Sequence, residues 1–137
     1  MAIKSTVFKA QLQIADMDRG LYADHALTLA RHPSETDERM MMRLVAFALC
    51  VPADDLRGAL TFAAGLSDPD EPDLWQKDLT GELIQWIEVG QPDERRMAKA
   101  CGRAERVRIW AYSSAVPIWW SAIEGKLVRQ ANLEVWQ

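Results

Sequence analysis

The sequence predicts an α+β protein in which a mixed β-sheet is flanked by helices and preceded by an N-terminal β-hairpin. Three observations lead to this fold class. Two adjacent segments near the N-terminus alternate between apolar and polar residues, helix-initiating residues occur at two later points, and short β-prone segments lie around those points. A chain of 137 residues has the length of one domain, and no internal repeat or long linker divides it. We therefore expect residues 1–137 to form a single domain.

The hairpin is predicted from residues 8–14 and 23–29. Apolar residues occupy most alternate positions of both segments, as expected of strands with one buried face. Residues 16–20 between them are rich in turn-forming side chains. These features together predict two paired strands.

The first helix is predicted directly after Pro33, because proline ends the preceding strand. The Ser34 hydroxyl can cap the free amides of the first turn, and Asp37 stands three residues later, as in a capping box. Apolar residues continue at helical spacing from there, and Pro52 marks the end of the helix.

Five further segments are candidate strands. Residues 60–64 are a short apolar run that fits either a buried strand or a helical turn. Residues 73–77 and 83–89 are predicted as the strands of a second hairpin. Residues 107–112, which are rich in branched and aromatic side chains, and residues 133–136 are the last predicted strands.

Two more helices are expected between these strands. Pro92, Asp93 and Glu94 have the composition of a first helical turn, and this helix is expected to reach about Arg106. Its basic residues are expected to share one face: Arg95, Lys99, Arg103 and Arg106. Pro117 begins a short third helix.

Composition restricts the possible functions. Cys50 and Cys101 have apolar neighbours and are interpreted as buried thiols, and His25 and His32 are not spaced as zinc ligands. A formal net charge of −4 argues against a surface that is basic throughout. Six of the sixteen Lys and Arg residues nevertheless lie between positions 95 and 108, so a local basic patch is expected.

Several common classes of protein lack support in the sequence. No apolar run approaches the roughly 18 residues of a membrane span, and the N-terminus does not resemble a signal peptide. We therefore expect a cytoplasmic protein without a membrane partner. No GxSxG elbow, GxxxxGK[ST] loop or GxGxxG turn occurs, so serine hydrolase, nucleotidase and dinucleotide-binding functions are not indicated.

Four strings, in this order and spacing, resemble the YaeQ family. They are IADMDR at residues 14–19, LTLARHPSET at 27–36, DEPDLW at 70–75 and GQPDERR at 90–96. The resemblance extends from the first strand to Trp136. Members of this family usually continue past that point with more strand and helix, so the resemblance implies that a C-terminal segment usual in the family is absent from these 137 residues.

The resemblance implies a core similar to that of PD-(D/E)XK nucleases, in which the order is helix, three strands, helix, strand. In that pattern an Asp after Pro and an acidic residue on the next strand hold a divalent cation, and a Lys follows two positions later. Asp73 and Glu88 stand in the matching places, which makes them the expected Mg²⁺ ligands, and Glu35 or Glu38 resembles an additional acidic residue of the site. Gly90 stands where the Lys would be.

The resemblance thus implies a Mg²⁺-dependent phosphodiesterase acting on nucleic acid. Its catalytic residues would be Asp73, Glu88, Glu35 and Gln91, with Gln91 placing a water. Lys77 or Lys99 could reach the site from another element in place of the missing Lys. The alternative is a non-catalytic module on the same scaffold that holds nucleic acid or a protein. Its nucleic-acid-binding residues would be Arg95, Lys99 and Arg103.

Structural roles also account for these residues. Pro72 and Asp73 could form a turn, Glu88 could pair with Arg95 or Arg96, and Glu35 could interact with the helix dipole. The basic residues of the second predicted helix could be a solvated face, and the six Trp residues could line the core. Two carboxylates about 4 Å apart repel by about 4 kcal/mol at an effective dielectric near 20. Converging carboxylates would therefore need a cation, a basic partner or protonation.

Overall fold

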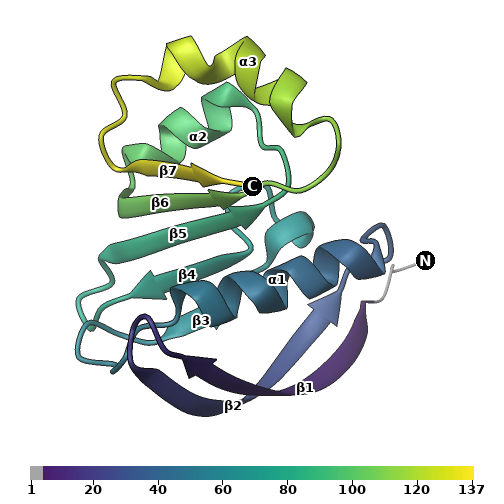
Figure 1. The fold of residues 1–137 in the computed structure, drawn as a ribbon, viewed down its shortest axis with the longest axis vertical. Coiled ribbons are helices and arrows are strands. Elements are labelled where there is room, and N and C mark those ends of the chain that lie inside the picture. The colour runs from purple at the N-terminus through teal and green to yellow at the C-terminus, as the bar shows by residue number, and fades with distance from the viewer. Residues whose placement is uncertain (1–4) are drawn as a thin grey trace.

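A computed structural model describes residues 5–137, which form the elements labelled in Figure 1. In chain order these elements are β1 (Thr6–Asp16), β2 (Leu21–Arg31), α1 (Asp37–Cys50), β3 (Leu60–Phe62), the 3₁₀ turn η1 (Gly65–Ser67), β4 (Leu74–Lys77), β5 (Leu83–Val89), α2 (Glu94–Cys101), β6 (Ala104–Trp110), α3 (Val116–Leu127) and β7 (Leu133–Trp136). The predicted α+β class, with an N-terminal hairpin and a mixed sheet, is confirmed.

The larger sheet has the strand order β3-β4-β5-β6-β7. The three strands β3, β4 and β5 pair antiparallel, whereas β5, β6 and β7 pair parallel. The parallel crossovers pass through α2 and α3, since parallel neighbours need a long connection. Strand β5 is therefore the central strand, and it pairs antiparallel with β4 on one edge and parallel with β6 on the other.

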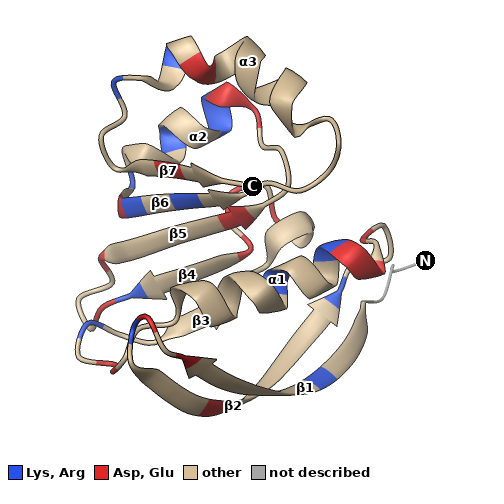
Figure 2. Ribbon diagram, viewed as in Figure 1, with Lys and Arg blue, Asp and Glu red and all other residues tan. Residues whose placement is uncertain are grey.

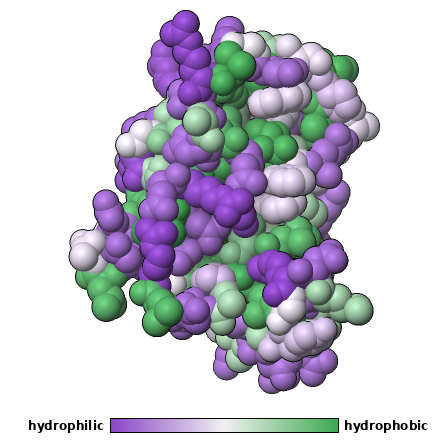
Figure 3. All heavy atoms as spheres, turned by 60° about the vertical axis from the view of Figure 1, so that its left-hand side comes forward, coloured by the Kyte–Doolittle hydropathy of each residue, from purple (hydrophilic) through white to green (hydrophobic). Residues whose placement is uncertain are grey.

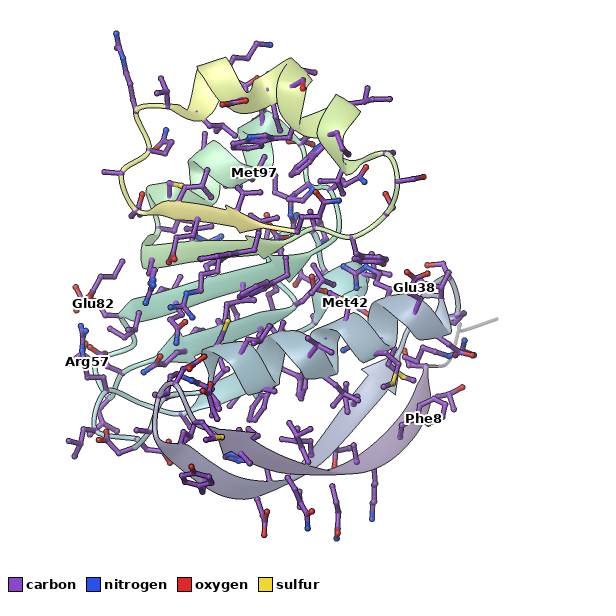
Figure 4. All side chains as sticks on the ribbon, viewed as in Figure 1. Phe8, Glu38, Met42, Arg57, Glu82 and Met97 are labelled. Atoms are coloured by element: carbon purple, nitrogen blue, oxygen red, sulfur yellow. The ribbon has the colours of Figure 1, made fainter. Side chains whose placement is uncertain are left out.

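Two hydrophobic clusters cover opposite faces of β5. Successive side chains of a strand point to opposite faces of the sheet. Ile87 and Val89 therefore belong to the cluster on the face that α1 covers, and Trp86 belongs to the cluster on the face that α2 and α3 cover. Figure 4 shows Met42 of α1 and Met97 of α2 among the side chains between the helices and the sheet. The sheet is thus covered by helices on both faces.

The hairpin packs against α1 on the side away from the sheet (Figure 1). Strands β1 and β2 pair antiparallel along their whole length, from Thr6 opposite Arg31 to Asp16 opposite Leu21. In the turn, the Arg19 guanidinium donates hydrogen bonds to the carbonyl oxygens of Ala48 (2.7 Å) and Val51 (2.8 Å). These contacts satisfy carbonyl groups at the end of α1, which otherwise lack partners.

The predicted cap of α1 was wrong by two residues. Thr36, not Ser34, is the N-cap, and its hydroxyl accepts a hydrogen bond from the Arg39 amide at 3.1 Å. The Ser34 hydroxyl lies 2.7 Å from Nδ1 of His32 instead, because the chain turns between these residues before it becomes helical. Asp37 does not close a capping box; it pairs with Arg31.

The predicted end of α2 was also wrong. The helix ends at Cys101, and the Gly102 amide donates to the carbonyl oxygens of Ala98 and Lys99 at the C-terminus of the helix. Arg103 therefore lies in the connection, and Arg106 lies on β6, where it pairs with Glu134 of β7. The four basic residues expected on one helical face are divided between a helix, a turn and a strand.

No helix within residues 5–137 is long and apolar enough to cross a membrane. On the face shown in Figure 3, hydrophilic residues predominate across the middle of the molecule, with smaller groups of hydrophobic residues among them. Figure 2 shows acidic and basic residues side by side in the first turns of α1 and α2. The candidate site lies near these turns.

Candidate functional site, a carboxylate and arginine pocket

A pocket of about 410 Å³ opens where the C-terminal end of β5 meets the loop before β4 and the start of α2. Five polar residues from these segments and from α1 line it: Arg39, Asp73, Glu88, Gln91 and Arg96. The antiparallel pairing of β4 with β5 brings the first end of β4 next to the last residues of β5. This pairing explains how two acidic residues that are fifteen positions apart reach one pocket.

Asp73 immediately precedes β4, and its side chain is almost completely buried, with 1% of the residue exposed. Its Oδ2 accepts hydrogen bonds from the Val89 amide at 2.9 Å and from the Arg39 guanidinium at 3.0 Å. Its Oδ1 lies 2.9 Å from the same guanidinium nitrogen, but no donor within residues 5–137 has hydrogen-bonding geometry toward it. One oxygen of this buried carboxylate therefore lacks a hydrogen bond.

Gly65 allows the loop to pass close to Asp73. A Cβ atom at position 65 would lie 2.8 Å from Asp73 Oδ1, which is too close for ordinary contact. The residue also has φ = +55°, a conformation that glycine adopts without steric cost. The backbone near this oxygen therefore depends on the absence of a side chain.

Glu88 is the second carboxylate of the pocket and is 5% exposed. Its Oε1 accepts a hydrogen bond from Nε of Arg96 at 2.5 Å, while Oε2 has no hydrogen-bond partner in the described chain. Burial raises the pKa of Glu88; the Arg96 charge and hydrogen bond oppose this effect, and the nearby Asp73 charge adds to it. A contact with the Trp86 indole has a smaller lowering effect on this pKa.

Arg39 connects two carboxylates. One terminal nitrogen donates to Oε2 of Glu35 at 2.7 Å, and the other contacts Asp73. Burial lowers the pKa of the Arg39 guanidinium, but the charges and hydrogen bonds of Asp73 and Glu35 outweigh that effect and raise it. The cation is therefore held charged between two buried anions.

Glu35 is held from both sides. Its Oε1 accepts from Arg43 at 2.6 Å, and Arg43 also donates to the carbonyl oxygen of Ala30 on β2. The ion pairs in this region thus form one chain of four residues, Arg43, Glu35, Arg39 and Asp73, and one separate pair, Arg96 and Glu88. Basic partners offset the repulsion between the carboxylates.

Gln91 lies at the mouth of the pocket. Its Nε2 donates a hydrogen bond to the Ser113 hydroxyl at 2.7 Å. Ser113 has φ = +135°, which is unusual for a residue with a side chain, and Gly90 has φ = +100°. A lysine at position 90, as the nuclease pattern would have it, would need a backbone conformation that lysine rarely adopts.

The structure brings together some of the candidate residues but not all. Asp73, Glu88 and Gln91 line one pocket, whereas Glu35 lies behind Arg39 and is not part of its lining. Two lysines that could have replaced the missing motif Lys do not line it either. Lys77 lies over the Trp75 ring, with its Nζ 3.8 Å from the ring centroid, and Lys99 pairs with Asp70 at 3.7 Å.

The candidate nucleic-acid-binding residues lie beside the pocket. Arg95 is exposed on α2, and Lys99 follows one turn later. Arg103 lies over the Trp86 ring, with its Cζ 4.9 Å from the centroid, and donates to the Asp70 carbonyl oxygen. Two of these three basic side chains are therefore engaged with the loop that forms one wall of the pocket.

Sequence reasoning missed two of the arginines. Arg39 and Arg43 follow Glu35 by four and eight residues, a spacing that places side chains on one helical face. That spacing was the available signal. The sequence left open a structural role for Glu88 as the partner of Arg95 or Arg96. In the structure Glu88 pairs with Arg96.

Oxygen donors are present for a hard cation. Within residues 5–137, no three His, Cys, Asp or Glu side chains are grouped closely enough to hold a metal ion. Two buried carboxylates nevertheless share the pocket, each with one oxygen that lacks a hydrogen bond. A buried polar atom without a partner calls for an explanation, and an ion or an ordered water is one.

The fold and the pocket define an α+β protein with a hairpin, a five-stranded mixed sheet and a carboxylate and arginine pocket at the end of its central strand. A family model described as YaeQ protein matches residues 1–137. The chain therefore belongs to the YaeQ family, as its sequence motifs indicated.

Relatives and solved structures agree with this assignment. Proteins named "Uncharacterized protein YaeQ" from Salmonella typhi and Escherichia coli K12 are 49% and 47% identical over 137 residues, which cover 99% of this chain and 73% of each relative. The crystal structure of YaeQ from Xanthomonas axonopodis pv. citri is 53% identical, with a TM-score of 0.86, and covers 96% of this chain and 72% of that one. The structure of YaeQ from Pseudomonas syringae is 41% identical, with a TM-score of 0.87, and covers 96% and 70%.

Proposed function

We propose that the pocket is the site of a divalent-cation-dependent phosphodiesterase that acts on nucleic acid. Asp73 and Glu88 are the protein ligands of the cation, and Gln91 places a water at the mouth of the pocket. Glu35 supports the site through Arg39, because it holds that guanidinium in position without lining the pocket. Glu35 is thus a positioning residue rather than a ligand.

The pair of buried carboxylates carries this proposal. Asp73, just before β4, and Glu88 of β5 are 1% and 5% exposed and line one pocket, and within residues 5–137 one oxygen of each accepts no hydrogen bond. A buried carboxylate oxygen without a hydrogen bond costs about 1–3 kcal/mol or more. Each carboxylate also contacts an arginine, but a bound cation would satisfy the oxygens that these contacts leave without a hydrogen bond.

The arrangement of the elements adds support. The order α1, β3, β4, β5, α2, β6 is the order of helix, three strands, helix and strand implied by the PD-(D/E)XK resemblance. Asp73 follows Pro72 at the start of one strand, and Glu88 lies on the next. This agreement in element order and in the positions of Asp73 and Glu88 supports the proposal that they are cation ligands.

The chemistry of the pocket suits Mg²⁺ or Mn²⁺. Magnesium is commonly bound through one or two carboxylates, with waters and substrate phosphate completing its coordination. Such a cation lowers the pKa of bound water and stabilises the charge that develops on a phosphodiester during attack. Arg39 and Arg96 already contact the same carboxylates, so a cation must compete with two guanidinium groups.

Cation titration tests the proposal. Calorimetry of chelator-treated protein with Mg²⁺ and Mn²⁺ should show one site that is lost in Asp73→Asn and Glu88→Gln. Glu105→Gln is the matched control, because Glu105 is an exposed carboxylate near the start of β6 and pairs with Arg57, which Figure 4 labels. The cation should also support cleavage of single- or double-stranded nucleic acid by the wild-type chain. No cation site at millimolar concentration would remove the basis of the proposal.

A non-catalytic nucleic-acid-binding module is the second candidate. The observation that favours it is charge balance: each pocket carboxylate already has its own arginine, and no lysine lines the pocket within the described residues. This candidate predicts salt-dependent retention of nucleic acid without cleavage. Replacing Arg95 and Lys99 by Ala should then weaken retention, whereas Asp73→Asn should leave it unchanged.

A further inference from the structure

Each pocket arginine makes contacts of two kinds, one to a pocket carboxylate and one to a separate anchor. Arg39 contacts Asp73 with one terminal nitrogen and Glu35 with the other. Arg96 contacts Glu88 through Nε, while its terminal nitrogens donate to the carbonyl oxygens of Pro69 (2.5 Å) and Glu71 (2.9 Å). If the carboxylates acquired another partner, both guanidinium groups would stay tethered at the pocket.

The contacts to the pocket carboxylates involve the donor atoms that would be freed. On Arg39 this donor is the terminal nitrogen within 3.0 Å of Asp73, and on Arg96 it is Nε. Both arginines line the pocket. Guanidinium groups bind phosphate oxygens through charge-assisted hydrogen bonds, which makes them suited to a phosphodiester.

The charges of the four side chains have a direct consequence for binding. Asp73, Glu88, Arg39 and Arg96 carry no net charge together, so the pocket without a cation gives little attraction to an anion. A divalent cation on the carboxylates would give the same group a net charge of +2. An anionic ligand would then meet both the cation and two released guanidinium donors.

We propose that Arg39 and Arg96 are the phosphate-binding residues of this pocket. Asp73 and Glu88 occupy the donor atoms of these arginines until a divalent cation binds the two carboxylates. The inference rests on the proposed cation site and adds the residues that bind substrate phosphate. Binding of the cation and of a phosphodiester is consequently coupled. By linkage, each ligand raises the affinity for the other by the same factor.

The test is a pair of reciprocal titrations on the wild-type chain with Mn²⁺ and dimethyl phosphate, a monoanionic diester. Saturating Mn²⁺ should tighten diester binding at least about fivefold, the lower end of the usual range for coupled sites. Saturating diester should tighten Mn²⁺ binding by the same factor. Inorganic phosphate and a dinucleotide, titrated in parallel, distinguish a site for free phosphate from one for a nucleic-acid backbone.

Two neighbouring arginines of α2 supply a matched pair of variants. Arg96→Gln should reduce the coupling, because it removes one of the two released donors, whereas Arg95→Gln should retain it in full, because Arg95 does not line the pocket. Arg39→Lys keeps the charge but loses one of the two contacts, so it should reduce the coupling. The wild-type titrations need no variant, so misfolding of a variant does not affect them.

The outcomes separate this inference from the proposed function. If Mn²⁺ binds and the affinity for the diester is the same with and without it, cation binding does not release the arginines. The inference is then wrong, while the cation site stands. If no cation binds, both the inference and the proposed function are wrong.

Discussion

The Arg39 guanidinium of α1 lies 3.0 Å from the Asp73 carboxylate at the start of β4 and joins two elements that are distant in sequence. The same arginine contacts Glu35, so it neutralises two carboxylates whose side chains are each 2% exposed. The wall of the pocket therefore contains buried ion pairs between Arg39 and two carboxylates. Its stability and its proposed function depend on the same side chains.

Replacing Arg39 by Gln should destabilise the protein by about 3–5 kcal/mol, the usual cost of leaving a buried charge without its partner. Urea unfolding in the presence of a chelator measures this difference. The double variant Arg39→Gln, Asp73→Asn should recover part of the loss, because the uncompensated carboxylate is then gone. Equal destabilisation in the single and double variants would show that the ion pair contributes little.

The pKa of Glu88 predicts a pH dependence with a definite sign. Burial raises this pKa, so the folded chain holds the Glu88 proton to higher pH than the unfolded chain does. This stabilising contribution is full below the unfolded pKa and is lost as pH rises through the folded pKa. In cation-free buffer, Glu88→Gln should therefore gain stability relative to the wild type as pH rises from about 4 to 7.

Glu105 gives a control of opposite sign. A hydrogen bond from Arg57 lowers the pKa of Glu105, so the wild type gains stability through this group as pH rises. Glu105→Gln should consequently lose stability relative to the wild type as pH rises toward the unfolded pKa of glutamate, about 4.3, and the difference should stay constant above it. Parallel pH dependence of the two variants would contradict the assigned environment of Glu88.

Introducing the lysine of the nuclease pattern at position 90 should destabilise the protein. Gly90→Lys places a side chain at φ = +100° and should destabilise the fold by about 1–3 kcal/mol, although no neighbouring atom blocks a Cβ there. Gly125→Lys is the control, because Gly125 is an exposed residue of helix α3, where lysine is favoured over glycine by up to about 1 kcal/mol. Thermal unfolding of both variants measures the contrast, and a stabilised Gly90→Lys would contradict the backbone assignment.

Ser113 should be under backbone strain that glycine would relieve. Both Ser113→Gly and Ser113→Ala lose the hydroxyl that Gln91 contacts, but only Ser113→Gly removes the cost of φ = +135°, about 1–3 kcal/mol. Ser113→Ala should be less stable than the wild type, and Ser113→Gly should be more stable than Ser113→Ala even after the entropy of glycine is included. Chemical denaturation measures both differences; an alanine variant as stable as the glycine variant would contradict the strain.

The strands were the most predictable part of the fold. Alternation in residues 8–14 and 23–29 identified the hairpin, because one face of each strand packs against α1. The predicted end of α2 was less accurate for a physical reason. Met97, Ala100 and Ala104 keep helical spacing across Gly102, although Ala104 is already the first residue of β6.

The candidate site was predictable in part. The motif order placed Asp73 and Glu88 on neighbouring strands, and the antiparallel register brings them to one pocket. The ionic partners depend on which side chains reach these carboxylates in three dimensions. Arg96 reaches Glu88 while its neighbour Arg95 points to solvent, a distinction that the sequence alone does not make.

A paramagnetic titration tests most directly whether Asp73 and Glu88 form one cation site. In ¹H–¹⁵N spectra, small amounts of Mn²⁺ should first broaden the amide signals of Gly65, Val89 and Gln91 around the pocket. The signals of Thr80 and Gly81, at the opposite end of β5, should remain sharp, and Asp73→Asn should abolish the selective broadening. Broadening that is absent, unselective or unchanged in Asp73→Asn would contradict the cation site.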